Sequence, residues 1–255
     1  MRLASSGSAG CDQFGGEECV DILIDLVTAG RVSKARLDAS AARLLRVKFR
    51  LGLFDDPYVD EAAAVAVLGD PAARAEGRWA QAASVTLLQG ELPVPRGRVY
   101  VEGIGDEAAA RLGEVVPDPA AADLAVIRLR APFEPRDDLF LESWFHQGSL
   151  DFPPGLRWRL ARIAQHCPVV LDVFLDRPAV LTDLLEVASV VVADYGTSDD
   201  ALVDALTGAV PAVGRLPFDL PRSMADVREH PEDRVGFADP LFACGFPGAG
   251  FTGPR

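Results

Sequence analysis

The sequence lacks the short motifs that most directly identify a chemistry. It contains no GxSxG, no P-loop and no HExxH, so no motif supports a serine hydrolase of the nucleophile-elbow type, a P-loop nucleotide-binding protein or a zinc metalloprotease. Its four cysteines form no CxxC pair, and only three histidines accompany them, which argues against a zinc site. We therefore expect free or buried thiols, no metal and no cofactor.

Basic residues are also scarce. The sequence contains 25 Lys and Arg and 38 Asp and Glu, which gives a net charge of −13. This balance argues against nucleic-acid binding and against anionic membrane surfaces, both of which need clustered cations. No apolar run reaches the roughly 18 to 20 residues of a membrane span. Residues 1–10 contain no apolar core of a signal peptide, so the sequence as written predicts a cytoplasmic location. A small uncharged ligand such as a sugar is compatible with this charge.

The first sixty residues have the apolar spacing of helices. One helix is predicted over residues 17–29, with Gly30 in the position just after its end. A second is predicted from Asp38, as its N-cap, to about Leu51. Two such helices cannot bury their apolar faces by themselves, so another part of the protein must cover them.

Strand and helix patterns alternate in the rest of the chain. A helix is predicted over residues 71–83 and a strand over 84–89, and the later elements follow in the same manner. Buried strands are predicted at 99–103, 124–129, 169–174 and 187–193, and helices at 107–112, 154–165, 180–186 and 198–206. This alternation predicts an α/β fold with a mostly parallel sheet covered by helices on both faces, an α/β sandwich.

Four segments follow from these patterns. Residues 1–59 form a helical segment, 60–97 a linker with a helix and the first strand, 98–245 the α/β sandwich, and 246–255 a disordered tail rich in Gly and Pro.

The loops after the strands are the places to look for a site, because ligands bind at the carboxyl ends of parallel strands. After the strand at 124–129, Glu134 lies between Pro132 and Pro135, with Arg130 and Arg136 nearby. The prolines stiffen this loop. Glu134 is then either a solvated residue paired with an arginine or a positioned general acid.

Other strand-end loops carry weaker signals. Trp144, His146 and Gln147 suit a sugar ring and its hydroxyls, but Trp144 and Phe145 could equally cover the sheet. Gly103 and Gly105 lack the third glycine of a dinucleotide-binding loop. Two further loops are predicted to be structural: Asp176-Arg177-Pro178 as a turn with a local ion pair, and Thr197 or Ser198 as a helix N-cap.

Three blocks of sequence, in this order, suggest a family. The first is GRVSKARLD at residues 30–38 with AARLLRVKFRLGLFDDPY at 41–58, the second is DALVDALTG at 200–208 with GRLP at 214–217, and the third is DPLF at 239–242 followed by Gly245 and Phe246. Together they resemble glycoside hydrolase family 3 across nearly the whole chain. The resemblance implies a (β/α)8-type barrel domain followed by an α/β sandwich, with a sugar bound between the two.

The resemblance also implies where this chain lies in such a protein. Family members are retaining β-glycosidases that use a carboxylate nucleophile and a carboxylic acid/base. The nucleophile is an aspartate in a Ser-Asp-Trp motif, which is absent here, and residues 9–13 resemble a stretch downstream of it. Residues 1–59 would then be the last helices of a truncated barrel domain, and Asp12 would not be the nucleophile.

The acid/base in several branches of the family is a glutamate after a strand of the type found at residues 122–127. The resemblance therefore implies Glu134 as the catalytic residue, although its surroundings differ from the commoner G-E-G-x-D-R form. Arg136 could orient Glu134, yet a cation lowers the pKa of a neighbouring carboxyl, against the needs of an acid. Arg136, Trp144 and His146 are the implied substrate-binding residues.

The implied function is the C-terminal part of a β-glucosidase-like glycoside hydrolase that acts on terminal β-linked sugars. Its partners would be a β-glycoside or oligosaccharide and the missing barrel half or another protomer, and the chain alone would be inactive. The alternative is a catalytically inactive truncated module with a sugar-binding or structural role.

Overall fold

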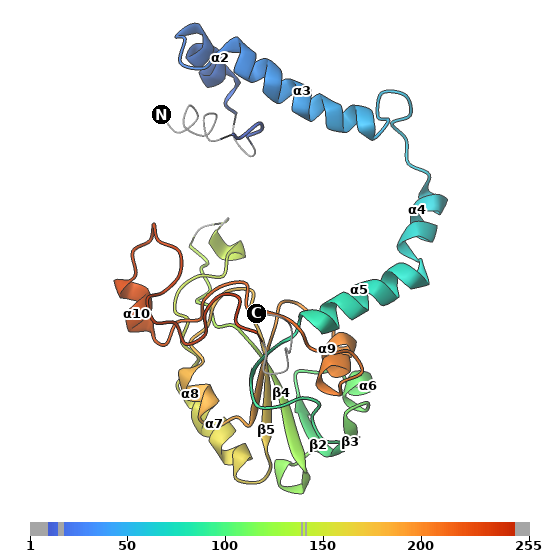
Figure 1. Cartoon of the computed structure of the whole chain (residues 1–255), viewed down its shortest axis with the longest axis vertical. Helices are drawn as coiled ribbons and strands as arrows, with labels where there is room; N and C mark the ends of the chain where they lie inside the picture. The colour runs from blue at the N-terminus through green and yellow to red at the C-terminus, as the bar shows by residue number, and fades with distance from the viewer. Residues whose placement is uncertain (1–9, 15–17, 139, 141, 248–255) are drawn as a thin grey trace. The chain divides into compact units, whose positions relative to one another are not determined.

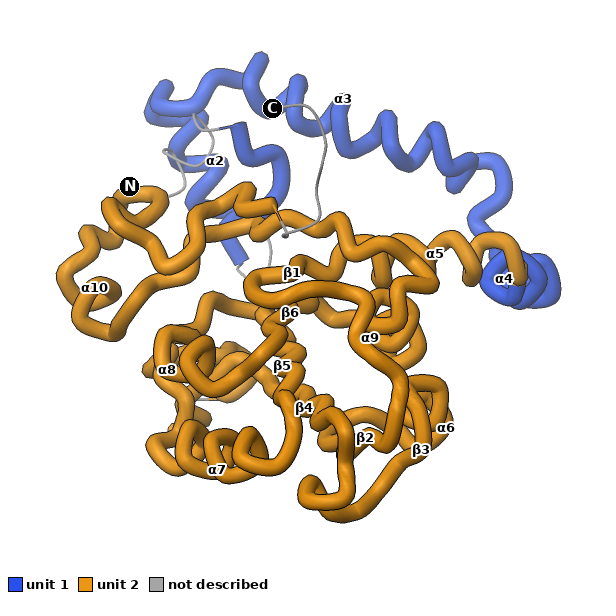
Figure 2. Tube along the Cα trace, turned by 60° about the horizontal axis from the view of Figure 1, so that its bottom comes forward, with its two compact units in different colours: residues 1–69 blue, residues 70–255 orange. Residues whose placement is uncertain are grey.

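The computed structural model describes residues 10–14, 18–138, 140 and 142–247 (Figure 1). The chain divides into two compact units, residues 1–69 and residues 70–255 (Figure 2). Each unit is described by itself. The predicted tail at 246–255 lies mostly outside the described residues.

The first unit contains the helices α2 (Val20–Thr28), α3 (Lys34–Arg50) and α4 (Glu61–Leu68). Gly30 has φ +68° and follows the end of α2, which confirms its predicted position, since a left-handed residue after a helix favours glycine. The predicted start of α3 is wrong. Ser33 caps α3 by accepting a hydrogen bond from the Arg36 N–H, so the helix begins before Asp38, which pairs with Lys34 at 2.9 Å. The predicted linker includes α4, which Asp60 caps.

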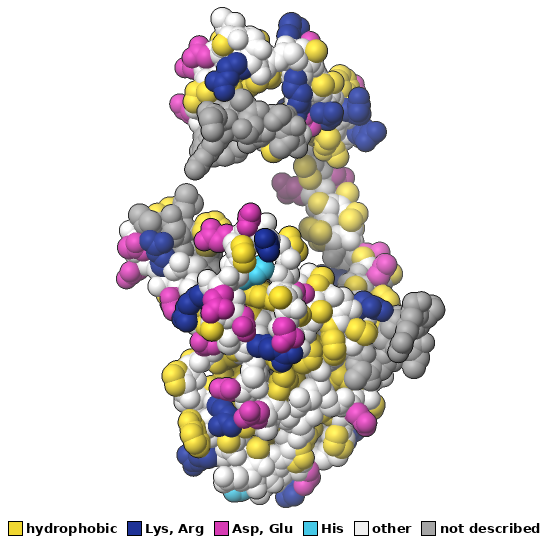
Figure 3. Space-filling view, turned by 60° about the vertical axis from the view of Figure 1, so that its left-hand side comes forward, with side chains coloured by type: hydrophobic (Ala, Val, Ile, Leu, Met, Phe, Trp, Pro, Cys, Tyr) yellow, Lys and Arg dark blue, Asp and Glu magenta, His cyan; other side chains and the backbone are white. Residues whose placement is uncertain are grey.

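Apolar side chains of this unit are exposed. Leu26 is the only buried side chain among its described helical residues, whereas Phe49 and Leu51 are each 65% exposed. On the face seen in Figure 3, hydrophobic and basic side chains of this unit are both at the surface. An apolar surface of this kind is typical of a segment that packs against another part of a protein.

The second unit contains a six-stranded sheet in the order β1-β6-β5-β4-β2-β3. Its strands are β1 (Thr86–Gln89), β2 (Gly97–Glu102), β3 (Gly113–Val115), β4 (Leu124–Arg130), β5 (Val169–Phe174) and β6 (Val190–Asp194). β1 pairs with β6 in the antiparallel sense, and the remaining pairs are parallel. The predicted mostly parallel sheet is confirmed. The short edge strand β3 was not predicted, because three residues are too few to show the alternation of apolar and polar side chains that indicates a strand.

Helices cover both faces of this sheet (Figure 1). One face carries α5 (Pro71–Ser84), α6 (Asp106–Ala109) and α9 (Asp199–Leu206), and the other carries α7 (Gly155–Ala164) and α8 (Thr182–Leu185). Each face of the sheet has its own hydrophobic core. Successive strand residues such as Val126 and Ile127 pack into different cores, because side chains alternate between the two faces along a strand. This arrangement confirms the α/β sandwich. The predicted cap of α9 is also confirmed, since the Ser198 hydroxyl accepts a hydrogen bond from the Ala201 N–H.

The remaining elements are the 3-10 turns η1 (Pro119–Ala121) and η2 (Glu142–Trp144) and the helix α10 (Met224–Glu229), which the sequence did not predict. None of the described helices is both long enough and apolar enough to cross a membrane. All four cysteines are free thiols.

The topology of the sheet predicts where a ligand-binding crevice would lie. From β2 the chain passes through α6 to β3 on one side, and β4 then pairs with the other side of β2. The winding direction therefore reverses between β2 and β4. Ligands of open α/β sheets bind outside the carboxyl ends of the strands at such a point. Glu134 follows the carboxyl end of β4.

Candidate functional site

The loop after β4, residues 131–150, is closed on itself by backbone hydrogen bonds. The Ala131 N–H donates to the Phe174 oxygen at the end of β5, at 2.8 Å. The Glu134 N–H donates to the Gln147 oxygen at 2.8 Å, and the Gln147 side-chain amide donates back to the Glu134 oxygen at 3.2 Å. The Leu150 oxygen then accepts the Val180 N–H at 2.9 Å. The end of β5 thus holds the start of the loop, the segment before α8 holds its end, and Glu134 and Gln147 join the outgoing arm that follows β4 to the arm that returns toward Leu150.

Glu134 is an exposed residue whose side chain lies against Gly148. A Cβ atom on Gly148 would lie 2.6 Å from the Glu134 Cβ, and Gly148 has φ +81°. Both the space and the left-handed backbone therefore require glycine at this position. Glu134 is thus an exposed residue just beyond the carboxyl end of β4, with its side chain, carboxyl group included, beside Gly148.

Arg136 pairs with a different carboxylate in this loop. Its Nε donates to Asp138 Oδ1 at 2.8 Å, and the hydrogen bonding of Arg136 is the main cause that lowers the pKa of Asp138. From the sequence, the Arg136 guanidinium could orient Glu134, whereas in the structure it pairs with Asp138, two residues along the chain.

The His146 ring has two contacts that hold it in place. Its ring stacks on Phe133, with centroids 3.8 Å apart and planes 10° apart. Its Nδ1 contacts Asp176 Oδ2 in the turn after β5. This contact was not predicted, because the sequence indicated only a local ion pair for Asp176. The available signal was the position of Asp176 at the carboxyl end of a neighbouring strand.

Trp144 is 74% exposed in η2, and its ring meets Phe140 edge-on at 6.3 Å. Phe145 is 65% exposed. The interpretation in which Trp144 and Phe145 cover the sheet is therefore wrong. The loop instead presents aromatic surface, which suits the apolar face of a sugar ring.

Four charged residues, two of them fully buried, meet near the carboxyl ends of the strands. Arg128 on β4 is in register with Asp172 on β5, and Arg128 Nε lies 3.0 Å from Asp172 Oδ2. The same guanidinium contacts Asp194 at 3.2 Å and Asp199 at 2.7 Å. Asp172 and Asp194 have no exposed surface. We call Arg128, Asp172, Asp194 and Asp199 the strand-end charge cluster.

A depression of about 450 Å³ opens next to this cluster. Its lining includes Gly103, Arg128, Arg130, Phe174, Gly196 and Thr197. Arg130 is in register with Phe174 and lies over its ring, with 5.0 Å between the guanidinium carbon and the ring centroid. The depression lies at the reversal point between β2 and β4, where the topology predicts a ligand crevice.

Burial raises the pKa of Asp172 well above its ordinary value, and the neighbouring Asp194 raises it further, against the opposing effect of Arg128. Among the described residues, neither Asp172 oxygen has a hydrogen-bond partner, so Arg128 Nε approaches Asp172 without the alignment of a hydrogen bond. Asp172 therefore keeps its proton to a higher pH than an exposed aspartate does.

This shift has a measurable consequence for stability. A carboxyl with a raised pKa contributes stability that is complete below its ordinary pKa of 3.8 and is lost as the pH rises through the raised value. Asp172→Asn removes this component because Asn does not ionise. We expect the unfolding free energy of the variant, relative to wild type, to increase with pH by up to about 1.4 kcal/mol per pH unit.

Urea unfolding between about pH 4.5 and about pH 7.5 measures this difference. Asp183→Asn makes the same chemical change at an exposed site on α8 and should give a curve parallel to that of wild type. A difference between Asp172→Asn and wild type that does not change with pH would contradict the assignment.

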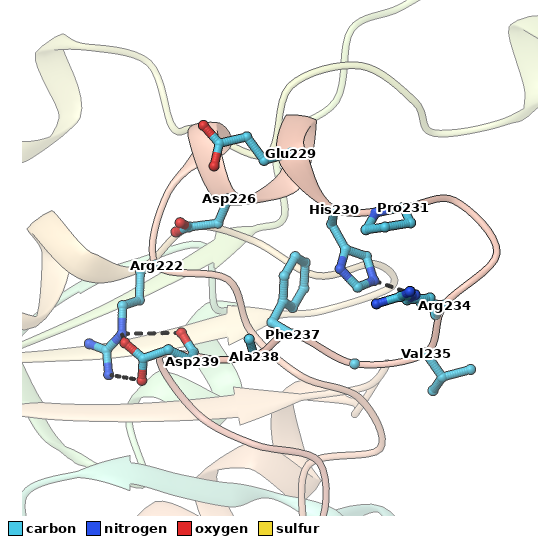
Figure 4. Close-up of a pocket in the computed structure, with 11 residues that line it drawn as sticks. Arg222, Asp226, Glu229, His230, Pro231, Arg234, Val235, Phe237, Ala238 and Asp239 are labelled. Atoms are coloured by element: carbon cyan, nitrogen blue, oxygen red, sulfur yellow. Dashed lines mark hydrogen bonds and ion pairs between the residues drawn. The ribbon is translucent and has the colours of Figure 1, made fainter.

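A second depression, of about 560 Å³, lies in the segment around α10 (Figure 4). Its lining mixes both charge signs, and Arg222 pairs there with Asp239 at 2.9 Å. His230 packs against Phe237, with centroids 4.8 Å apart, and its Nε2 contacts the Arg234 oxygen. None of the residues predicted for the site lies in this lining. Among the described residues, no group of three or more His, Cys, Asp or Glu is arranged to hold a metal ion.

Asp12 is held by α3. Its Oδ1 contacts Arg36 at 2.9 Å, Arg43 at 2.8 Å and the Ser40 hydroxyl at 2.8 Å. The Ser40 hydrogen bond is the largest cause that lowers the pKa of Asp12. These contacts join the segment at residues 10–14 to the helix.

Comparison with known proteins gives consistent matches. The model of the glycosyl hydrolase family 3 C-terminal domain matches residues 57–247. Beta-glucosidase C of Emericella nidulans is 44% identical over 242 residues, covering 91% of this chain and 39% of the relative. A periplasmic beta-glucosidase/beta-xylosidase of Dickeya chrysanthemi is 37% identical over 254 residues, covering 96% of this chain and 39% of the relative.

Solved structures match the fold. A beta-glucosidase from Listeria innocua, in complex with isofagomine, superposes with a TM-score of 0.62 at 20% identity, covering 88% of this chain and 41% of that chain. A mutant exo-1,3/1,4-beta-glucanase from a Pseudoalteromonas species gives a TM-score of 0.62 at 19% identity, covering 96% of this chain and 48% of that chain. The chain spans about 40% of the length of the curated relatives it matches along most of its length.

Proposed function

This chain belongs to glycoside hydrolase family 3, and on that premise we propose that it is the C-terminal part of a retaining β-glycosidase of the β-glucosidase type. The observation that carries the proposal is Glu134, an exposed residue held by backbone hydrogen bonds in the loop at the carboxyl end of β4. The names of relatives that are 37% and 44% identical support the β-glucosidase type.

Glu134 is assigned the role of acid/base in this proposal. It donates a proton to the glycosidic oxygen as the leaving group departs and later accepts a proton from the attacking water. A retaining enzyme also needs a carboxylate nucleophile about 5 to 5.5 Å from the acid/base. We assign the nucleophile to a part of the protein outside this chain. The absence of Ser-Asp-Trp from the sequence and the engagement of Asp12 by α3 support this assignment.

Three side chains are proposed to contact the sugar. Trp144 offers an exposed indole face and Arg136 a guanidinium on the same loop. His146 has its Nδ1 directed at Asp176 and one ring face on Phe133, so its Nε2 is the atom left for a sugar hydroxyl.

The exposed apolar surface of the first unit fits the same proposal. Phe49 and Leu51 would pack against the remainder of a barrel domain, supplied by a longer protein or by another protomer. Removal of this apolar surface from water would favour such an assembly.

Complementation tests the division of roles. The purified chain is expected to show no turnover of an aryl β-glucoside, because it lacks the nucleophile. Fusing it behind the upstream portion of the Emericella nidulans relative should produce hydrolysis, and NMR of the first sugar released should show the β-anomer. Turnover by the chain alone would contradict the external nucleophile. A folded but inactive fusion would favour the sugar-binding or structural module instead.

A further inference from the structure

The returning arm of the loop at residues 131–150, which carries His146 and Gly148, is tied to the turn after β5. We propose that Asp176 in this turn is a positioning residue for Glu134 and acts through His146. The inference rests on the proposed function, because it assigns Asp176 a role in the same acid/base step.

The turn after β5 is itself firmly anchored. Leu175 is buried, and its N–H donates to the Asp194 oxygen at the end of β6, at 2.8 Å. Asp176 and Arg177 follow directly. Asp176 contacts His146, and Arg177 Nη2 donates to the Gly148 oxygen at 2.9 Å. Two consecutive residues in the turn beyond the carboxyl end of β5 therefore contact the returning arm of the loop, on both sides of Gln147.

The returning arm in turn contacts the outgoing arm, through the rings of His146 and Phe133 and the backbones of Gln147 and Glu134. An ionised carboxylate only accepts hydrogen bonds, so Nδ1 of His146 carries the proton directed at Asp176. This bond sets the orientation of the imidazole ring, which stacks on Phe133. Phe133 directly precedes Glu134, and Gln147 directly follows His146 and accepts the Glu134 N–H. The residue before Glu134 and the backbone of Glu134 are therefore both held by the arm that Asp176 anchors.

Glu134 needs this support because it is exposed and lies on a long loop. Long loops without regular structure have many accessible conformations. Proton transfer needs the acid within hydrogen-bond reach of the glycosidic oxygen, and a displacement of about 1 Å can cost about 100-fold in rate. An anchored imidazole ring next to Glu134 restricts such displacement.

Asp176→Asn in the fusion protein tests the role in catalysis. Asn keeps the size of the side chain but loses the charge, which weakens the bond to Nδ1. We expect kcat on an alkyl β-glucoside to fall about 10- to 100-fold, with little change in KM. A dinitrophenyl β-glucoside should be nearly unaffected in the cleavage step, because its leaving group departs without a proton. A general loss of structure would lower both rates alike.

Amide hydrogen exchange on the 255-residue chain tests the anchoring without any activity. Asp176→Asn should speed exchange at the Glu134 N–H, which bonds to Gln147, and leave the amide of Ile127 in the buried strand β4 unchanged. Asp151→Asn makes the same chemical change at an exposed residue near the end of this loop and should alter neither exchange nor kcat.

The outcomes separate this inference from the proposed function. If Glu134→Gln is inactive but Asp176→Asn has normal exchange and normal kcat, the positioning role is overturned and the proposed function stands. If Asp176→Asn speeds exchange at Glu134 while Glu134→Gln remains fully active, Asp176 anchors the loop but the acid/base assignment is wrong. Slower cleavage of only the alkyl substrate, together with faster exchange, supports both.

Discussion

Glu134→Gln in the fusion protein is expected to lower kcat on an alkyl β-glucoside by about 100- to 10,000-fold, the usual contribution of general acid/base catalysis. Gln has nearly the same size as Glu but cannot donate a proton as a carboxylic acid does. The loop should keep its shape, because the bonds between Glu134 and Gln147 use the backbone of Glu134. The loss should be much smaller for the first cleavage of a dinitrophenyl β-glucoside, whose leaving group needs no proton.

Steady-state kinetics on the two substrates measure this effect, and added azide provides a second readout. Azide attacks a glycosyl-enzyme without help from a base, so it should restore turnover of the dinitrophenyl substrate and give a β-glycosyl azide. Glu186→Gln is the matched control, because Glu186 is exposed and pairs with Arg157 at 2.6 Å on the helical layer. Unchanged kcat in Glu134→Gln would rule out Glu134 as the acid/base.

Arg128→Met is expected to lower the free energy of unfolding of the sheet-containing unit by about 3 to 5 kcal/mol. Met fills a similar volume but leaves Asp194 buried without its cation. Asp199 also loses its contact at 2.7 Å. Removing one partner from a buried ion pair is costly because the remaining charge is neither solvated nor paired.

Urea unfolding at neutral pH measures the loss, and Arg130→Met is the matched control. Arg130 is an exposed residue two positions along the same strand, and it lies over the ring of Phe174. Loss of such a cation–π contact costs about 0.5 to 1 kcal/mol. Equal and small losses in the two variants would contradict a stabilising role for Arg128 in the strand-end charge cluster.

The buried strands β4 and β5 were predictable because their signal is local. Each is a run of large apolar residues of strand length, and the helices between them have their own period. The antiparallel direction of β1 was not predictable, since it depends on which strand the segment meets. The helices α4 and α10 escaped prediction because α4 is Ala/Val-rich without an apolar stripe and α10 has only six residues.

The candidate site also contains one residue that the sequence could indicate and contacts that only the fold could show. Glu134 could be proposed from the sequence because it follows a predicted strand, at the place where the family resemblance implies a glutamate. The His146–Asp176 contact joins residues 30 positions apart. The Arg128–Asp172 contact depends on the register of β4 against β5. Neither contact has a spacing that a sequence pattern could show.

The sequence by itself determined the α/β class, the family and local features such as the Ser198 cap of α9. Those features depend on interactions within a few residues, so their patterns are visible along the chain. The tertiary structure alone decided that Asp176 anchors His146 and that Arg128 meets three carboxylates. Side chains at the ends of parallel strands come together only when strand order and register are set, and burial of both faces of the sheet sets them.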